Sequence, residues 1–316
     1  MVSSSSNNPR ALKGYMTMRL GEIGEDRLLA PLLPRLPLGK EVINGPGDDC
    51  AVVDVLDKKS FLVLKTDCVV AGKHFLPTAS ALEVGWKAMM RPLSDFAATS
   101  ALPRFGLVTL IAPGKTKVEW VNRLYRGLGL AAKRFKVSMV GGETSGTTGP
   151  LVISVSAIGS VEKKRCVSRR GGKSGDDLFV TGRLGGALKR KHLEFIPRIT
   201  ESRWLTRNFR IHAMMDLSDG LGADLPRLAK ASSVGFIIEM ENLPLSRGVT
   251  NENAISDGED YELLFAISPR ERNRLVRCWH QKFPRLPLTR IGRLDSKSAV
   301  RSAKLPGGYT HFQQLR

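Results

Sequence analysis

The sequence predicts a chain of two domains, one α+β and one α/β. Short apolar runs separated by glycine and acidic turns alternate with amphipathic stretches at helical spacing, which is typical of these two fold classes. A basic, glycine-rich stretch at 162–175 interrupts the pattern near the middle of the chain. We therefore expect a disordered tail over 1–18, a first domain over 19–162 and a second domain over 163–316.

The first half of the chain contains strand-like and helix-like stretches in alternation. Continuous or alternating apolar residues predict strands at 60–70, 104–112, 137–140 and 151–161. Apolar residues at helical spacing predict helices at 81–98 and 118–135. Proline lacks a backbone N–H and its ring crowds the preceding turn, so Pro92 is expected to kink or divide the first of these helices.

The second half repeats this alternation with shorter pieces. Strands are predicted at 177–181, 235–240 and 286–294. The segment 214–230 indicates the end of a strand, an acidic turn and then a helix, and 258–265 indicates an acidic segment that leads into a strand. A glycine-rich turn at 182–186 follows the first strand of this half.

The charge of the chain favours anionic partners. It has 49 Lys plus Arg against 30 Asp plus Glu, and between 161 and 210 the counts are 14 and 5. Nucleic acid is one such partner, because basic residues that neutralise phosphates bind without reading sequence. No stacking aromatics interleave with the basic runs, and no known nucleic-acid-binding pattern accompanies them. A solvated basic face is therefore favoured over a nucleic-acid site, which stays open as an alternative.

Two absences in the sequence bear on the compartment of the protein. No apolar run approaches the ~20 residues that a membrane helix needs, so no membrane partner is expected. The four cysteines form no CxxC pair, and the N-terminal stretch lacks a signal-peptide pattern. These observations predict a protein of the reducing cytoplasm, without a disulfide framework or a structural zinc site.

Acidic residues recur beside glycine or at the ends of expected strands. They are Asp48, Asp49, Asp67, Asp95, Glu143, Asp216 and Asp219. Any one of them alone is more often an ordinary turn residue. Carboxylates that converge at strand ends are, however, the ligands that Mg²⁺ prefers, usually shared with substrate phosphates. The set therefore predicts a magnesium site. No Walker A loop accompanies it, because Val167 stands at the first glycine position of the nearest match.

Seven motifs, in order, carry a resemblance to a known family. They are LGEIGE at 20–25, GDDCAV at 47–52, TDCVVAGKHF at 66–75, LSDFAA at 93–98, GGET at 141–144, DLSDGL at 216–221 and GEDYELLF at 258–265. From about residue 20 to 312 the chain resembles the thiamine-monophosphate kinases of the aminoimidazole ribonucleotide synthetase-like superfamily. The resemblance implies an N-terminal α+β domain that dimerises through its sheet, a C-terminal α/β domain, and an active-site cleft between them. It also implies a homodimer.

The resemblance further implies an activity and a set of site residues. The activity is direct, in-line transfer of the γ-phosphoryl group of ATP to thiamine monophosphate, assisted by several Mg²⁺ ions. Carried over residue by residue, the metal ligands would be Asp49, Lys65 through its carbonyl, Thr66, Asp67, Asp95, Glu143, Asp216 and Asp219. Asp95, Asp216 and Asp219 would be the catalytic residues among them. ATP would contact Gly142, Glu143, Arg169 and Ser218, and the thiamine phosphate would contact His74, Glu259 and Tyr309.

Some positions depart from the family pattern. Glu143 stands where the family usually has Asp, which moves the carboxylate out by one methylene group. Arg91 and Pro92 replace the usual Val and Asn before Leu-Ser-Asp, and Ser100 replaces a usual Gly. The long helix expected after Gly182 is much shortened. Two alternatives stay open: another ATP-dependent member of the superfamily with a different small phosphate acceptor, and a degenerate basic scaffold that binds nucleic acid.

Overall fold

The computed structural model describes residues 18–296, 305 and 307–309, and the structural statements below concern these residues. The chain divides into two compact units, one formed by 1–39 with 309–316 and the other by 40–308. In the first unit, α2 (Leu20–Leu29) is interrupted at Gly24, whose positive φ of 72° is not helical. The expected tail lies, except for Met18, outside the described residues.

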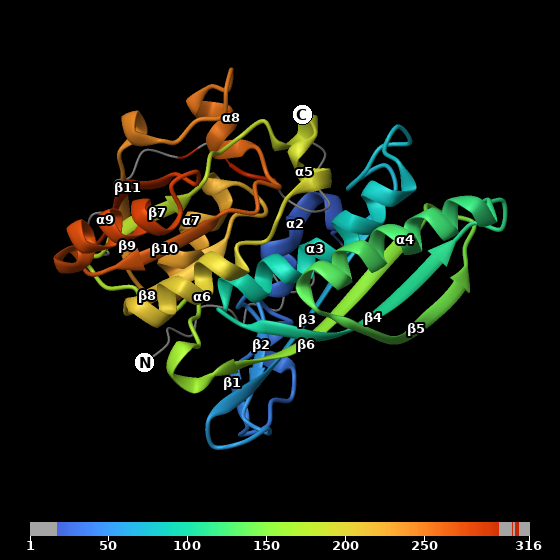
Figure 1. The fold of residues 1–316 in the computed structure, drawn as a ribbon, viewed down its shortest axis with the longest axis horizontal. Coiled ribbons are helices and arrows are strands. Elements are labelled where there is room, and N and C mark those ends of the chain that lie inside the picture. The colour runs from blue at the N-terminus through green and yellow to red at the C-terminus, as the bar shows by residue number, and fades with distance from the viewer. Residues whose placement is uncertain (1–17, 297–304, 306, 310–316) are drawn as a thin grey trace. The chain divides into compact units, whose positions relative to one another are not determined.

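The larger unit contains a six-stranded sheet with the order β1-β2-β3-β6-β4-β5 (Figure 1). Its strands are β1 (Val42–Asn44), β2 (Ala51–Val53), β3 (Ser60–Val70), β4 (Leu102–Ala112), β5 (Ser138–Gly146) and β6 (Val152–Glu162). Neighbouring strands are antiparallel except β4 and β5, which are parallel. Two long helices, α3 (Ala81–Ala98) and α4 (Val118–Phe135), lie along one face of this sheet.

The sequence predicts the bounds of β3, α3 and α4 correctly, whereas two details differ. Pro92 lies inside α3 without dividing it, because α3 is buried along most of its length and tertiary packing outweighs one lost hydrogen bond. Strand β5 continues through the glycines to Gly146 instead of ending at 140. Gly142 permits this, since a Cβ there would lie 1.8 Å from the carbonyl oxygen of Val108 on β4.

A five-stranded sheet with the order β8-β10-β7-β11-β9 forms the second part of this unit. Its strands are β7 (Asp177–Thr181), β8 (Ile211–Asp216), β9 (Gly235–Ile238), β10 (Leu263–Ile267) and β11 (Leu288–Asp295). The accompanying helices are α5 (Lys191–Glu194), α6 (Ile199–Asn208), α7 (Leu221–Ala231), α8 (Asn251–Ser256) and α9 (Arg272–Lys282). All pairings in this sheet are antiparallel, so the second part is α+β rather than α/β in the strict sense.

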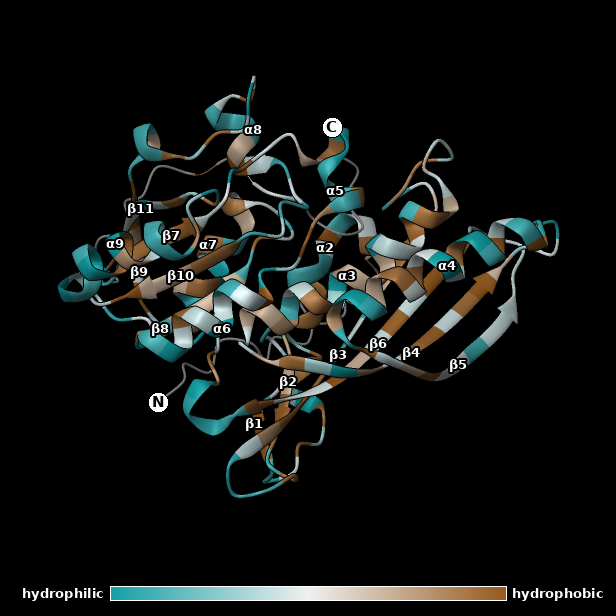
Figure 2. Ribbon diagram, viewed as in Figure 1, coloured by the Kyte–Doolittle hydropathy of each residue, from teal (hydrophilic) through white to brown (hydrophobic). Residues whose placement is uncertain are grey.

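Helix α3 connects the two sheets of the larger unit. It contacts β3 and β6 of the first sheet and also β8 and α6 of the second part. One apolar core accordingly contains Phe96 of α3 together with Met214 of β8 and Phe265 of β10. Figure 2 shows mainly hydrophobic residues on β4 and β6, and hydrophilic segments on α4. The polar side chains of α3 therefore lie between the first sheet and the second part of the unit.

Within the described part of the chain, each helix is too short or too polar to span a lipid bilayer.

Candidate active site

Three buried aspartates from separate elements meet in the larger unit. Asp49 precedes β2, Asp95 lies near the end of α3, and Asp216 ends β8. One carboxylate oxygen of each lies within 4.8 Å of the others. The Oδ2 atom of Asp49 is buried and has no hydrogen-bond partner among residues 18–296, 305 and 307–309. Such a cluster of oxygen donors fits a hard divalent cation, which would supply the missing partner.

The aspartates repel one another, and this shows in their pKa values. Burial, together with the neighbouring carboxylates, raises the pKa of Asp95 well above its ordinary value. Burial, with Asp49 beside it, raises the pKa of Asp216 to about 7. Two cations offset part of the repulsion. Lys65 Nζ lies 2.8 Å from Asp95 Oδ1, and Arg169 Nη2 lies 2.6 Å from Asp49 Oδ1.

Strand alternation separates two of the predicted metal ligands. Lys65 and Asp67 lie on one face of β3, where Asp67 is near Lys65, Arg91 and Asp95. Thr66 points to the opposite face, where its hydroxyl accepts a hydrogen bond from Ser156 Oγ at 3.0 Å. The structure therefore places Asp67 beside the aspartate cluster and the Thr66 side chain away from it. Thr66 could reach the cluster only through its backbone.

The turn after β8 holds the next two predicted residues. The backbone N–H groups of Ser218 and Asp219 both donate to Asp224 Oδ2 at 3.0 Å. The side chain of Asp219 accepts from Arg227 Nη1 at 2.5 Å and is not one of the three clustered carboxylates. Asp224 is completely buried and orders this turn. Asp224 is absent from the residues expected from the sequence, although acidic residues are favoured in the first turn of a helix, where it lies in α7.

The predicted ATP contacts are spread over two places. Gly142 and Glu143 are exposed on β5, and Glu143 Oε1 accepts from the backbone N–H of Thr144 at 2.9 Å. Glu143 is not one of the clustered carboxylates. Arg169 is instead bound to Asp49 through Nε at 3.1 Å and Nη2 at 2.6 Å. The structure thus joins Arg169, but not Glu143, to the aspartate cluster.

A second polar group joins two of the predicted substrate contacts. Lys87 on α3 is completely buried, and its Nζ donates to the carbonyl oxygen of His74 and to Glu259 Oε2, each at 2.5 Å. His192 Nδ1 lies 2.7 Å from the same Nζ and 2.8 Å from Glu259 Oε2. Lys87 therefore holds the loop of His74 against Glu259. We call these four residues the Lys87 group.

The Lys87 group has strongly shifted titration. Burial lowers the pKa of Lys87 to about 8. Burial acts to raise the pKa of Glu259, but the hydrogen bond from His192 and the charge of Lys87 bring it down to about 2. Glu259 also has a positive φ of 65°, which is uncommon for a residue with a side chain. Lys87 is absent from the residues expected from the sequence, although its signal is visible there: it lies in a row of charged residues at four-residue spacing on α3, with Glu83, Arg91 and Asp95.

Tyr309 belongs to the other compact unit, so its predicted contact with the substrate stays a prediction.

Half of the 14 basic side chains in the stretch at 161–210 are paired with acidic residues within the described part of the chain. Seven of its basic side chains form ion pairs with acidic residues: Lys163, Arg165, Arg169, Arg190, Lys191, Arg198 and Arg203. Each such pair removes a cation from the set that could bind phosphates of a nucleic acid. The choice between a solvated basic face and a nucleic-acid site stays a prediction.

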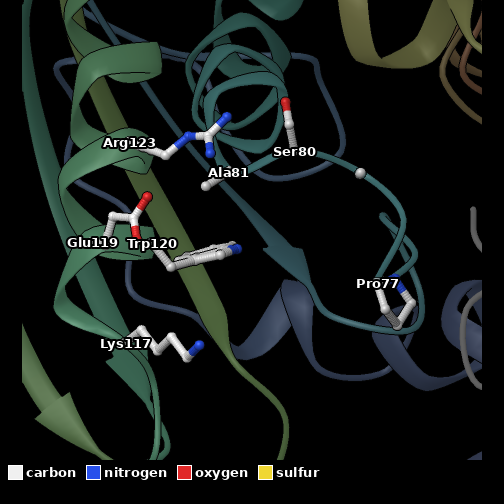
Figure 3. Close-up of a pocket in the computed structure, with 8 residues that line it drawn as sticks. Pro77, Ser80, Ala81, Lys117, Glu119, Trp120 and Arg123 are labelled. Atoms are coloured by element: carbon white, nitrogen blue, oxygen red, sulfur yellow. The ribbon is translucent and has the colours of Figure 1, made fainter.

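A surface pocket lies apart from the predicted site residues (Figure 3). Its lining comes from the start of α4 and from the loop before α3, with Lys117, Trp120 and Arg123 on the helix side and Pro77 and Ser80 on the loop side. None of the predicted metal, ATP or substrate contacts lines this pocket. The aspartate cluster and the Lys87 group therefore remain the candidate site.

Comparisons with known proteins define the class of this chain. Residues 47–161 match the family described as "AIR synthase related protein, N-terminal domain", and residues 169–301 match the corresponding C-terminal domain. The chain therefore belongs to the AIR synthase related proteins, which agrees with its two-domain fold.

Similarity to individual proteins shows to which family within this class the chain belongs. The thiamine-monophosphate kinase of Rhodopirellula baltica is 36% identical over 294 residues, covering 87% of this chain and 91% of that protein. The thiamine-monophosphate kinase of Aquifex aeolicus is 35% identical, covering 93% and 100%. A solved structure of AaThiL complexed with AMPPCP and TMP has a TM-score of 0.78 and 32% identity, covering 93% of this chain and 99% of that chain. Within its class, the chain belongs to the family of thiamine-monophosphate kinases.

Proposed function

We propose that this protein transfers the γ-phosphoryl group of ATP to thiamine monophosphate in a single in-line step assisted by magnesium. The observation that carries the proposal is the convergence of buried Asp49, Asp95 and Asp216 from three distant parts of the chain. Family membership supports the substrate pair, since a solved relative was complexed with AMPPCP and TMP. The products would be thiamine diphosphate and ADP.

The aspartate cluster is the part of the chain suited to magnesium. Asp49, Asp95 and Asp216 would hold the cation, with Asp67 beside them and the backbone of Lys65 and Thr66 within the same strand. Magnesium, when bound, would neutralise phosphate oxygens of donor and acceptor and bring them together. The unpartnered Oδ2 atom of Asp49 fits this role. The number of ions, and the participation of Asp219 and Glu143, stay predictions.

The residues of the chain itself would orient the reactants and balance their charge. The acceptor phosphate is already anionic, so the reaction needs no strong general base. Lys65 and Arg169 place positive charge at the edge of the aspartate cluster. The Lys87 group fixes Glu259 and the loop of His74, the two residues predicted to contact the thiamine phosphate. Gly142 and Ser218 remain predicted ATP contacts.

An assay with a panel of acceptors tests this proposal. The purified chain is incubated with ATP and magnesium, and with thiamine monophosphate, free thiamine or another small phosphate ester, and the products are separated by chromatography. We expect thiamine diphosphate from the monophosphate only. Product from another phosphate acceptor alone would favour the alternative enzyme. Absence of turnover together with steeply salt-dependent binding of nucleic acid would favour the basic scaffold.

We also propose that the chain forms a homodimer through its first sheet. Apolar side chains are exposed on the edge strand β5 and on its neighbour β4, among them Met139 on β5 and Phe105 and Leu107 on β4. Such residues favour association when they lie together on one surface. Sedimentation equilibrium tests this proposal: the mass of two chains is expected, and the mass of one chain at micromolar concentration would contradict it.

The predicted domain bounds near 162 and the cytoplasmic location remain proposals as well. The two matched family ranges, which end at 161 and begin at 169, support a boundary in the basic stretch.

A further inference from the structure

Two side chains near the aspartate cluster carry buried hydrogen-bond donors that have no partner within the part of the chain that the structure describes. They are Nε and Nη1 of Arg91 and the hydroxyl group of Tyr261. A buried donor without a partner is costly, because folding removes its bonds to water and returns none. Unpaired donors of this kind indicate a ligand that supplies the acceptors.

Arg91 lies between the two polar groups of the candidate site. Lys87, Arg91 and Asp95 follow one another at intervals of four residues on α3, so they lie in one row along the helix. The first member of this row binds Glu259, and the last belongs to the aspartate cluster. A ligand that reaches from Glu259 to the aspartates would therefore pass Arg91.

Acidic groups lie close to the guanidinium group of Arg91. Burial acts to lower the pKa of its guanidinium group, but nearby Tyr261, Asp67 and Glu259 raise that pKa above its ordinary value. The guanidinium therefore stays charged, while Nε and Nη1 still form no hydrogen bond with these neighbours.

Tyr261 is held rigidly beside it. Its ring stacks on Phe195 with the centroids 3.7 Å apart, and its backbone N–H donates to the carbonyl oxygen of Leu217 at 2.8 Å. Its φ is +52°, a value that few residues with side chains adopt. The hydroxyl group therefore cannot turn easily toward another partner within the protein.

We propose that Arg91 and Tyr261 bind the phosphate group of the acceptor. This inference rests on the proposed function and adds two residues to its site. A phosphate offers several acceptor oxygens, and a guanidinium fork matches two of them. The acceptor is favoured over ATP because both side chains neighbour Glu259, which is predicted to contact the thiamine phosphate.

Substitutions of the two side chains test the inference. In Arg91→Met, KM for thiamine monophosphate is expected to rise ~10- to 100-fold, whereas KM for ATP stays within about 2-fold. Arg91→Lys, which keeps the charge but loses the fork, is expected to fall between this variant and the wild type. Tyr261→Phe is expected to raise KM for thiamine monophosphate by about 3- to 10-fold. Matched controls are Arg126→Met and Tyr125→Phe, which change exposed side chains on α4.

Two further measurements on these variants distinguish ligand binding from a structural role. Tyr261→Phe is expected to raise the melting temperature of the free protein slightly, because it removes a buried hydroxyl group that has no hydrogen-bond partner within the described residues. Calorimetry with magnesium present compares thiamine monophosphate with free thiamine. We expect the variants at both positions to lose affinity for the monophosphate only, so the preference for the phosphorylated ligand falls.

Several results would overturn the inference. An active wild type whose Arg91→Met and Tyr261→Phe variants keep their preference for the monophosphate would refute it and leave the proposed function standing. A rise in KM for ATP alone would assign these donors to the other phosphate and also refute it. A wild type that forms no thiamine diphosphate would refute the proposed function itself, and this inference with it.

Discussion

Replacing Asp216 by Asn should stabilise the metal-free protein while removing its activity. Asp216 is 2% exposed, and its pKa is about 7 instead of the ordinary 3.8. A rise of about 3 units disfavours the charged carboxylate in the folded state by about 4 kcal/mol, at 1.36 kcal/mol per unit. Asn has the same shape and no charge, so it escapes this penalty.

The pH dependence of this effect has a definite sign. Between pH 3.8 and about 7 the folded state holds a proton on Asp216 that the unfolded state has released. The free energy of unfolding of the wild type therefore falls as pH rises through this window, and the loss is complete above it. The advantage of Asp216→Asn in EDTA should be about 4 kcal/mol at pH 8 and about 1–2 kcal/mol at pH 5.

Denaturant unfolding in EDTA, followed by tryptophan fluorescence at both pH values, measures this difference. In magnesium the order should change: the wild type gains stability from the ion, whereas Asp216→Asn gains less. Its turnover should fall by ~10²-fold or more, because a charge that organises the site is lost. A variant that is less stable than the wild type in EDTA at pH 8, or whose advantage does not depend on pH, would refute the reasoning.

Three other substitutions test separate parts of the account. Asp95→Asn should lower kcat by ~10²- to 10³-fold without changing the circular dichroism spectrum, and near-normal turnover would exclude Asp95 from the metal site. Glu259→Gln should lower the free energy of unfolding at pH 7 by about 3 kcal/mol, because the pKa of Glu259 in the folded protein is about 2. The difference in this free energy from the wild type should shrink as pH falls from 4.5 toward 2. A difference that stays constant with pH would contradict this explanation. Gly142→Ala places a Cβ 1.8 Å from a backbone oxygen of β4, so it should lower the free energy of unfolding, measured with denaturant, by about 2–3 kcal/mol. The control is Gly146→Ala on the same strand, whose Cβ would meet no atom within 4 Å. Equal stability of the two glycine variants would show that β5 can move away from β4.

Regular elements with a strong pattern are predictable from this sequence. The bounds of α3 and β3 follow from the spacing of their apolar residues, because both are long elements with a clear pattern. Strand β5 was predicted too short, since paired glycines usually indicate a turn. Here they permit close packing of a parallel edge strand, which depends on the distant carbonyl group of Val108. Local propensity cannot reveal such a contact.

In the candidate site too, some features are predictable from local sequence patterns and others depend on distant contacts. The acidic motifs predict that Asp49, Asp95 and Asp216 converge, and the structure brings their carboxylates together. The side chain of Thr66 points away from these carboxylates, which follows from the alternation of side chains along a strand and could have been predicted. Two of the partners of Lys87, His192 and Glu259, lie more than a hundred positions away in the sequence, and only the tertiary fold brings them to it. The row of charges at four-residue spacing on α3 was nevertheless visible in the sequence.

Phosphorus NMR of one reaction mixture tests the central claim most directly. The mixture contains the wild-type chain, ATP, thiamine monophosphate and magnesium, and a parallel sample contains excess EDTA. The account predicts that thiamine diphosphate appears in a one-to-one ratio with ADP and that neither forms with EDTA. Release of inorganic phosphate from ATP without thiamine diphosphate, or formation of thiamine diphosphate at full rate in EDTA, would contradict it.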